Sequence, residues 1–213
     1  MDTVVELRGV VAVLGRFPAL AGVDLAVSRA EILLLQGPNG AGKTSLLRVC
    51  AGLLPIERGE GRILGVDVAA DREAVRPRIG LLGHANGLYL DLTVRQNISF
   101  WASMVGATAD EVSSAMTLMG LDGRLAGVRA SKLSAGQRRR CALASLIVRR
   151  AELWLLDEPH AGLDAAGRDE LDGVLRSAAS AGATIMVASH ERERAAGLAT
   201  RVVTVDGGMV SPG

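Results

Sequence analysis

Short apolar runs alternate along the chain with longer stretches in which apolar residues recur at helical spacing. Runs of four or five nearly all apolar residues are typical of strands buried on both faces of a parallel sheet. Because helical stretches separate these runs, the pattern predicts an α/β fold with a central parallel sheet and helices on both sides. The runs lie at residues 31–35, 79–82, 153–156 and 184–188.

The N-terminal part of the chain carries a different pattern. Residues 4–7 and 25–27 favour strands, and glycine and proline mark turns between them, so we expect an antiparallel β portion there. Residues 43–51 carry apolar side chains at helical spacing and are followed by Gly52, a stop signal. A helix is therefore expected directly after a glycine-rich loop.

A mainly helical stretch interrupts the strands. The apolar spacing is helical from about 93 to 125, where Thr93 and Thr108 are suitable N-cap residues, and a further helix is expected over 137–150. We therefore predict a single domain over residues 1–213 with a helical insert at roughly 85–145.

Composition restricts the class of protein. Hydrophobic residues make up 49% of the 213 residues, yet no apolar run approaches the roughly 18 residues that a membrane helix needs. The N-terminus lacks the basic start and apolar centre of a signal peptide, so we expect a cytosolic protein. A net charge of +1 gives no electrostatic argument for nucleic-acid binding. Cys50 and Cys141 lack CxxC spacing and lie among small apolar residues, which favours buried thiols over a disulfide or zinc site.

The chain contains a complete phosphate-binding motif, GxxxxGK[ST], between an expected buried strand and a helix. Its glycines allow backbone N–H groups to point at phosphate oxygens, and the helix N-terminus adds positive potential. Lys43 should reach the β and γ phosphates of a nucleotide, and the Thr44 hydroxyl should bind Mg²⁺. A purely structural glycine turn is the alternative. The motif comprises Gly37, Pro38, Asn39, Gly40, Ala41, Gly42, Lys43 and Thr44.

Two carboxylates follow the apolar run at 153–156, at the end of a strand where ligands bind in open α/β sheets. Asp157 can hold the metal, directly or through water. Glu158 can polarise the attacking water as a general base. An acidic pair that merely ends a strand is the other interpretation, and the phosphate-binding motif argues against it.

Residues 134–137, with the sequence SAGQ, open the expected helix over 137–150. Ser134 is a suitable N-cap, and a turn that contains glycine leaves amides free to meet an anion. Taken alone, such a serine caps a helix far more often than it contacts a ligand.

Five motifs together resemble the nucleotide-binding subunits of ABC transporters, and the resemblance covers essentially the whole chain. In order they are GPNGAGKT, LSAGQ, LLDEP, AGLD at 161–164 and SH at 189–190. The resemblance implies an ABC ATPase domain of the P-loop NTPase class. It also implies a head-to-tail homodimer that holds each ATP between the phosphate loop of one subunit and the LSAGQ turn of the other.

The resemblance also implies roles for single residues. Asp164 corresponds to a dimer-contact loop, and His190 corresponds to a switch histidine that contacts the γ-phosphate, although a lone histidine after a strand is usually structural. The turn expected to contact ATP on the partner subunit consists of Ser134, Ala135, Gly136 and Gln137.

Two positions, His84 and Ala135, depart from the usual pattern of these subunits, and the residue that stacks on adenine is a separate question. His84 stands where most relatives carry a glutamine that senses Mg²⁺ and γ-phosphate, and an imidazole can hydrogen-bond a metal-bound water or ligate metal. Ala135 replaces the commoner glycine. Phe17 is the candidate for stacking on adenine, but burial in the N-terminal sheet is equally compatible with the sequence, and Arg16 could lie over the base instead.

The GH pair at 83–84, the arginines after LSAGQ and the stretch 151–159 resemble the CcmA family, the ATP-binding subunits of haem exporters in cytochrome c maturation. That resemblance implies a peripheral position on the cytoplasmic face of the inner membrane, with membrane partners of the CcmB and CcmC type. No motif here should ligate haem. The alternatives are a subunit of an exporter for a drug or lipid, and a soluble ABC ATPase that acts on ribosomes or DNA.

Three further features have a simpler interpretation. The arginines at 138–140 are expected on a solvated helix face rather than against a lipid or a partner. Phe100 and Trp101 could line a groove for a membrane subunit, but core packing is at least as compatible. We assign no role to His160.

Overall fold

A computed structural model of the chain describes residues 2–190 and 192–213. The chain forms two compact units. The first contains the residues up to Leu81 together with Glu152–Glu158 and Val174–Gly213. The second contains Leu82–Ala151 and Pro159–Gly173, so the predicted insert at roughly 85–145 lies within its first segment.

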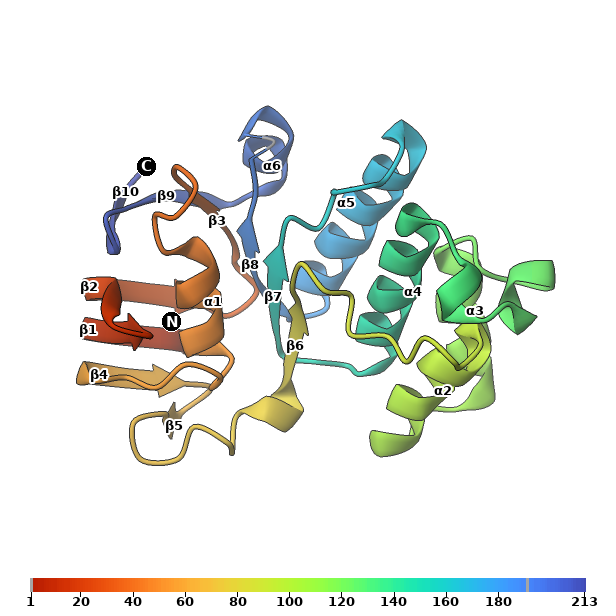
Figure 1. Cartoon of the computed structure of the whole chain (residues 1–213), viewed down its shortest axis with the longest axis horizontal. Coiled ribbons are helices and arrows are strands. Elements are labelled where there is room, and N and C mark those ends of the chain that lie inside the picture. The colour runs from red at the N-terminus through yellow and green to blue at the C-terminus, as the bar shows by residue number, and fades with distance from the viewer. Residues whose placement is uncertain (1, 191) are drawn as a thin grey trace. The chain divides into compact units, whose positions relative to one another are not determined.

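The first unit contains a four-stranded sheet with the order β2-β1-β4-β5, and its paired strands are antiparallel (Figure 1). The inward side chains of its long strands, such as Val5, Val10 and Leu20, are fully buried. The sheet confirms the predicted N-terminal antiparallel portion. Its strands are β1 (Thr3–Leu14), β2 (Phe17–Ser28), β4 (Arg58–Ile63) and β5 (Val66–Asp67).

A six-stranded sheet with the order β10-β9-β3-β8-β7-β6 completes the strands of this unit. β8 pairs in parallel with both β7 and β3, β9 pairs in parallel with β3, and β10 pairs antiparallel with β9. The four apolar runs form β3, β6, β7 and β8, as the sequence predicts. The strands are β3 (Ile32–Gln36), β6 (Ile79–Leu82), β7 (Leu153–Asp157), β8 (Thr184–Ala188), β9 (Arg201–Asp206) and β10 (Met209–Pro212).

Helix α1 (Lys43–Cys50) contacts strands of both sheets and fills the space between them (Figure 1). Leu46, Leu47 and Cys50 on this helix are buried, and burial raises the pKa of the Cys50 thiol to about 12. The expectation of a buried thiol is thus confirmed. Helix α6 (Arg192–Leu198) contacts β3, and the 3₁₀ turn η1 (Arg76–Arg78) leads into β6.

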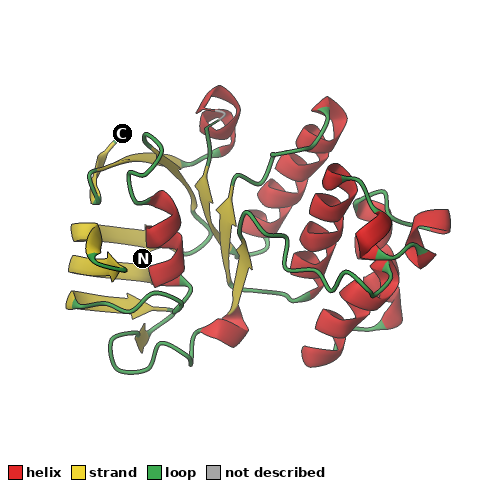
Figure 2. Ribbon diagram, in the orientation of Figure 1, coloured by secondary structure: helices red, strands yellow, loops and turns green. Residues whose placement is uncertain are grey.

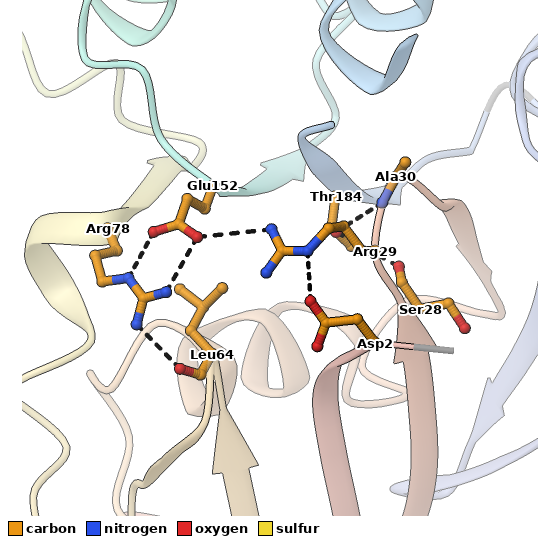
Figure 3. Close-up of polar contacts among 8 residues, drawn as sticks. All are labelled: Asp2, Ser28, Arg29, Ala30, Leu64, Arg78, Glu152 and Thr184. Atoms are coloured by element: carbon orange, nitrogen blue, oxygen red, sulfur yellow. Dashed lines mark hydrogen bonds and ion pairs between the residues drawn. The ribbon is translucent and has the colours of Figure 1, made fainter. Parts of the chain in front are cut away.

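A charged network lies at the amino end of β7 (Figure 3). Nε and Nη2 of Arg78 donate to the two carboxylate oxygens of Glu152, at 2.6 and 3.0 Å, and Nη1 of Arg78 donates to the Leu64 carbonyl at 3.0 Å. Arg29 lies 3.7 Å from the same carboxylate and pairs with Asp2 at 2.6 Å. Segments that are distant in sequence are therefore joined at the end of the sheet opposite to the carboxyl ends of its strands.

The second unit is built mainly from helices (Figure 2). Helices α2 (Val94–Met104) and α3 (Ala109–Leu118) both contact α4 (Ala135–Val148), most of whose residues are buried. Thr93 and Thr108 each form a capping box, as the sequence predicts. Burial raises the pKa of the Cys141 thiol on α4 to about 12, so this second cysteine is also buried as expected.

The remaining elements are short turns and one long helix. The 3₁₀ turns η2 (Gly123–Gly127) and η3 (Ala130–Lys132) connect α3 to α4, and α5 (Ala165–Ser180) begins in the second unit and ends in the first. Among residues 2–190 and 192–213, no helix has the length and apolar character needed to cross a membrane.

Candidate nucleotide site

The phosphate-binding motif forms the loop between β3 and α1. Gly37 has φ of 146°, and a Cβ atom there would lie 2.0 Å from the carbonyl oxygen of Val205, so a side chain at this position is excluded. Gly42 has φ of 111° and occupies the N-cap of α1 without any side-chain cap. The first N–H groups of α1 are therefore not capped by a side chain, which suits an anion.

Lys43 is the first residue of α1, and only 7% of it is exposed. Its ammonium donates to the carbonyl oxygens of Gly37 at 2.8 Å and Pro38 at 2.9 Å, so the side chain folds back over the loop. A buried ammonium on a flexible stem can exchange these carbonyl oxygens for phosphate oxygens.

Two hard oxygen donors lie next to this loop. The Thr44 hydroxyl, in the first turn of α1, donates to Oδ2 of Asp157 at 2.8 Å. Asp157 is the last residue of β7, and it pairs in parallel register with Ala188 at the end of β8. The phosphate-binding loop and the acidic end of β7 thus lie together at the carboxyl ends of the parallel strands, as expected for an open α/β sheet.

Glu158 directly follows Asp157 in a left-handed conformation with φ of 50°, which non-glycine residues rarely adopt. Its N–H donates to the Ala188 carbonyl at 2.8 Å. The His190 N–H donates to Oε2 of Glu158 at 3.3 Å, and the His190 ring nitrogen Nε2 lies 3.4 Å from Oε1. Backbone strain of this kind is typical of functional sites, because the surroundings must hold it. The structure brings the predicted base and switch histidine together.

The LSAGQ turn lies in the second unit, at the start of α4. Ser134 accepts from the Gln137 N–H at 3.2 Å, and the Gln137 side chain accepts from the Ser134 N–H at 3.0 Å, which completes a capping box. Ser134 and Ala135 are exposed. A Cβ atom at Gly136 would lie 2.7 Å from the Gly162 carbonyl oxygen, so glycine is required there.

Asp164 is exposed in the same unit. Its carboxylate accepts from the Gly167 N–H at 3.0 Å and from Nη2 of Arg140 at 3.4 Å. The hydrogen bond from Gly167, and then the charge of Arg140, hold the pKa of Asp164 below its usual range. The side chain is therefore an anion at neutral pH and remains accessible.

A sequence model of the ABC transporter family matches residues 20–161. The cytochrome c biogenesis ATP-binding export protein CcmA of Chelativorans sp. (strain BNC1) is 41% identical over 80% of this chain and 83% of its own length. CcmA 2 of Cupriavidus metallidurans is 38% identical over 95% of this chain and 97% of its own length. The dimeric bacterial ABC transporter cassette MJ0796 has a TM-score of 0.88 at 23% identity, over 97% of this chain and 96% of that one.

The chain belongs to the ABC transporter family, among its CcmA proteins. As an ABC ATPase domain it binds and hydrolyses ATP. The similarity to MJ0796 supports the P-loop ABC ATPase fold, because the two structures share their backbone arrangement over nearly the whole chain.

Two further predicted site residues, His84 and Phe17, are also exposed. His84 is exposed in the segment that follows β6, and its role stays a prediction. Phe17 is 79% exposed at the tip of the β1–β2 hairpin. The alternative of Phe17 buried in the N-terminal sheet is therefore wrong, because Phe17 is the first residue of β2, directly after the turn, and its side chain is exposed there. Stacking of Phe17 on adenine stays a prediction.

The expectation of a solvated arginine face on α4 is wrong for Arg139. Only 4% of Arg139 is exposed, and its guanidinium donates to the carbonyl oxygen of Gly83, at 2.8 Å, and to other acceptors. Its spacing from Leu143 and Leu146 places it on the apolar face of α4, a signal present in the sequence. His160, with no predicted role, is 1% exposed, and its Nε2 lies 2.8 Å from the Asp172 carboxylate.

Proposed function

We propose that this chain is the ATPase subunit of an exporter that serves cytochrome c biogenesis, and that it hydrolyses MgATP as a head-to-tail homodimer. One observation carries the proposal. Five side chains suited to hold and cleave a triphosphate lie at the carboxyl ends of β7 and β8 and in the adjoining phosphate loop. These groups are Lys43, Thr44, Asp157, Glu158 and His190.

In this proposal the phosphate loop and the first turn of α1 bind the nucleotide. The residues of 37–42 other than Pro38 offer backbone N–H groups, and the Lys43 ammonium reaches the β and γ phosphates. The Thr44 hydroxyl and the Asp157 carboxylate are the hard oxygen donors that Mg²⁺ prefers. No cluster of three or more His, Cys, Asp or Glu side chains in the described chain could hold a metal ion by itself. Oxygen atoms of phosphate and water would provide the other ligands of Mg²⁺, and bound Mg²⁺ would neutralise part of the phosphate charge.

Hydrolysis falls to Glu158. Its carboxylate takes a proton from water as the water oxygen forms a bond to the γ phosphorus, and the bond from that phosphorus to the oxygen of ADP breaks. The strained backbone and the hydrogen bond from the His190 N–H restrict the direction of the carboxylate. His190 is 52% exposed at its side chain and can also contact the γ-phosphate.

A second subunit completes each site in this proposal. Ser134 and the amides near it are exposed in a unit separate from the phosphate loop, so they are available to a nucleotide held by the partner. Asp164 is an exposed anion suited to a contact across the dimer. A structure of MJ0796, which shares the fold, is dimeric and supports a homodimer of this chain. His84 would face the γ-phosphate and metal, and Phe17 would stack on adenine.

The cellular role rests on the relatives. Two CcmA proteins that cover most of this chain are named for cytochrome c biogenesis and export. We therefore infer membrane partners of the CcmB and CcmC type, a peripheral position on the cytoplasmic face of the inner membrane, and haem handling driven by ATP. The chain itself is not expected to ligate haem or bind nucleic acid.

Mixing two inactive variants tests the shared site. Lys43→Ala removes the phosphate contact but keeps the LSAGQ turn, whereas Ser134→Asp keeps the phosphate loop and places a negative charge against the partner's nucleotide. Asp caps a helix about as well as Ser, so α4 should remain folded. Each variant alone should lack ATPase activity, and an equimolar mixture should recover it through one intact site per heterodimer.

The matched control is Ser134→Asn, which also caps the helix but carries no charge. It should retain far more activity than Ser134→Asp, while thermal unfolding of both variants matches that of the unchanged protein. Mixtures that stay inactive at concentrations where the unchanged protein is active would refute the shared site.

Gene deletion tests the cellular role. Loss of the gene should abolish mature c-type cytochromes, and the unchanged gene should restore them while Glu158→Gln should not. Normal cytochrome levels in the deletion strain, with loss of some other export function, would instead assign the subunit to an exporter of a drug or lipid.

A further inference from the structure

We propose that Arg139 is a positioning residue for ATP hydrolysis, because its buried guanidinium joins the LSAGQ helix to the segments next to His84 and Glu158. The inference rests on the proposed function, in which the LSAGQ turn of one subunit and His84 and Glu158 of the other act on the same nucleotide. Within one chain, Arg139 therefore links groups that serve the two different nucleotides of the dimer. It adds a residue that lies outside the motifs and contacts no expected nucleotide atom.

The guanidinium of Arg139 contacts two segments that are distant in the chain. Nη1 donates to the Gly83 carbonyl at 2.8 Å and to Oδ1 of Asn86 at 3.1 Å. Nε donates to the Pro159 carbonyl at 3.3 Å. All four residues belong to the second unit, so the contacts lie within one compact body.

The acceptors of Arg139 lie next to two residues of the proposed active site, His84 and Glu158. Gly83 directly precedes His84 and Asn86 follows it closely, so Arg139 holds this segment on both sides of the histidine. Pro159 directly follows Glu158. Gly136 lies less than one helical turn before Arg139 on α4, so a shift of the LSAGQ turn carries Arg139 with it.

Burial makes this arrangement stiff. Removing a guanidinium from water costs free energy, and only well-aligned hydrogen bonds offset that cost. Arginine offers five N–H donors in a planar fork that can serve acceptors in diverging directions, which a lysine ammonium cannot reproduce. Arg139 is 4% exposed, whereas the side chain of Arg150, just beyond α4, is 59% exposed.

A second buried contact fixes the same segment after Glu158. His160 follows Pro159, and its ring nitrogen Nε2 lies 2.8 Å from Oδ1 of Asp172 on α5. His160 and Asp172 are both buried. Pro159 and His160 are therefore held from α4 and from α5, and Arg139 supplies the link that also reaches His84.

Steady-state kinetics test the inference. Arg139→Gln and Arg139→Lys should lower kcat by about tenfold or more, while the affinity for a fluorescent ATP analogue changes by less than about threefold, because the phosphate loop is untouched. The control Arg150→Gln removes an exposed guanidinium from the same unit and should leave kcat and KM unchanged. Values of kcat within about twofold of the unchanged protein for Arg139→Gln would overturn the inference.

Chemical rescue separates positioning from general stability. In Arg139→Ala, added guanidinium ion at concentrations well below those that denature proteins should restore part of kcat, and it should not activate the control. A variant that unfolds is replaced by Arg139→Lys, the smallest change. Unfolding of every variant, or the absence of rescue in a folded Arg139→Ala, would assign Arg139 to stability alone.

The Glu158→Gln background distinguishes this inference from the proposed function. With ATP, Glu158→Gln should run as a dimer on size exclusion, and the double variant with Arg139→Gln should form less dimer at the same ATP concentration. If Glu158→Gln stays monomeric, the dimer proposal fails. The kcat effect of Arg139→Gln then still decides the inference.

Discussion

The Thr44 hydroxyl donates to the Asp157 carboxylate at 2.8 Å across a separation of 113 residues. Thr44 belongs to the first turn of α1, and Asp157 ends β7. The bond joins the phosphate loop to the acidic strand end, so the two side chains proposed to hold Mg²⁺ are already adjacent.

Asp157→Asn tests this pair. The amide oxygen can still accept from Thr44, so the fold should be unchanged, but the loss of the negative charge should weaken metal binding roughly 10- to 100-fold. Titrating ATPase activity with Mg²⁺ should show a matching rise in the concentration needed for half-maximal rate. Thr44→Ser keeps the hydroxyl and is the control. Equal Mg²⁺ dependence of Asp157→Asn and the unchanged protein would exclude Asp157 as a metal-holding group.

Glu158→Gln separates binding from chemistry. The amide retains the shape and the acceptor for the His190 N–H, but it cannot take a proton from water. ATP affinity should remain, and kcat should fall by about 10²- to 10⁴-fold, the usual contribution of a general base. Single-turnover hydrolysis of radiolabelled ATP measures the chemical step. A rate close to that of the unchanged protein would remove Glu158 from the base role.

Lys43→Ala should weaken nucleotide binding. The Lys43 ammonium is buried, and one charge-assisted hydrogen bond from it to a phosphate would contribute about 1.5–3 kcal/mol, so we expect about a 10- to 100-fold loss of ATP affinity. The loss should be smaller for adenosine, which lacks phosphates. Isothermal titration of both ligands gives the comparison, and unchanged ATP affinity would contradict the role of the loop.

The sequence predicts the strands that are buried on both faces, because their apolar runs are continuous and short. β8 has the predicted bounds Thr184–Ala188. Helix starts at Thr93 and Thr108 are also predicted, since capping depends on neighbours within three residues. β9 and β10 were not predicted. The alternation and the β-branched residues of β9 do favour a strand, whereas β10 is a short edge strand with little burial.

Some contacts of the candidate site can also be predicted from the sequence, and others cannot. Thr44 and Asp157 could be expected to meet, because both follow parallel strands and the carboxyl ends of parallel strands share one edge. The acceptors of Arg139 could not be predicted, because those at Gly83 and Pro159 are main-chain carbonyls, which any residue offers. The approach of the Gly162 carbonyl to Gly136 likewise depends on the fold of loops that carry no periodic pattern.

Gly136→Ala tests this close approach in the LSAGQ turn. The added Cβ would lie 2.7 Å from the Gly162 carbonyl oxygen, so the backbone must shift, at a cost of about 1–3 kcal/mol. ATPase activity should fall strongly while the melting temperature falls only a little, because the displaced turn is the part that contacts the nucleotide. Ala135→Gly is the control and should keep activity, since it removes an exposed methyl. Full activity in Gly136→Ala would show that the turn tolerates displacement.

The network in Figure 3 gives a prediction for stability against pH. Glu152 accepts two hydrogen bonds from Arg78 at the amino end of β7, and this contact holds the pKa of Glu152 below its ordinary value of 4.5. The unfolded chain therefore binds more protons than the folded chain between the lowered pKa and 4.5. The stabilisation is complete above 4.5 and is lost as the pH falls through the lowered pKa.

Glu152→Gln should accordingly destabilise the protein at neutral pH and have little effect in acid. We expect a loss of about 1 kcal/mol at neutral pH, because both side chains of the pair are more than a third exposed and solvent screens them. Urea unfolding of both proteins at a series of pH values should show the difference shrinking steadily below pH 4.5, where Glu152 becomes protonated in the unfolded chain first. Glu73→Gln, in an exposed pair with Arg76, is the control and should change stability little at any pH. A difference between Glu152→Gln and the unchanged protein that persists undiminished in acid would mean that the contact acts through packing rather than through charge.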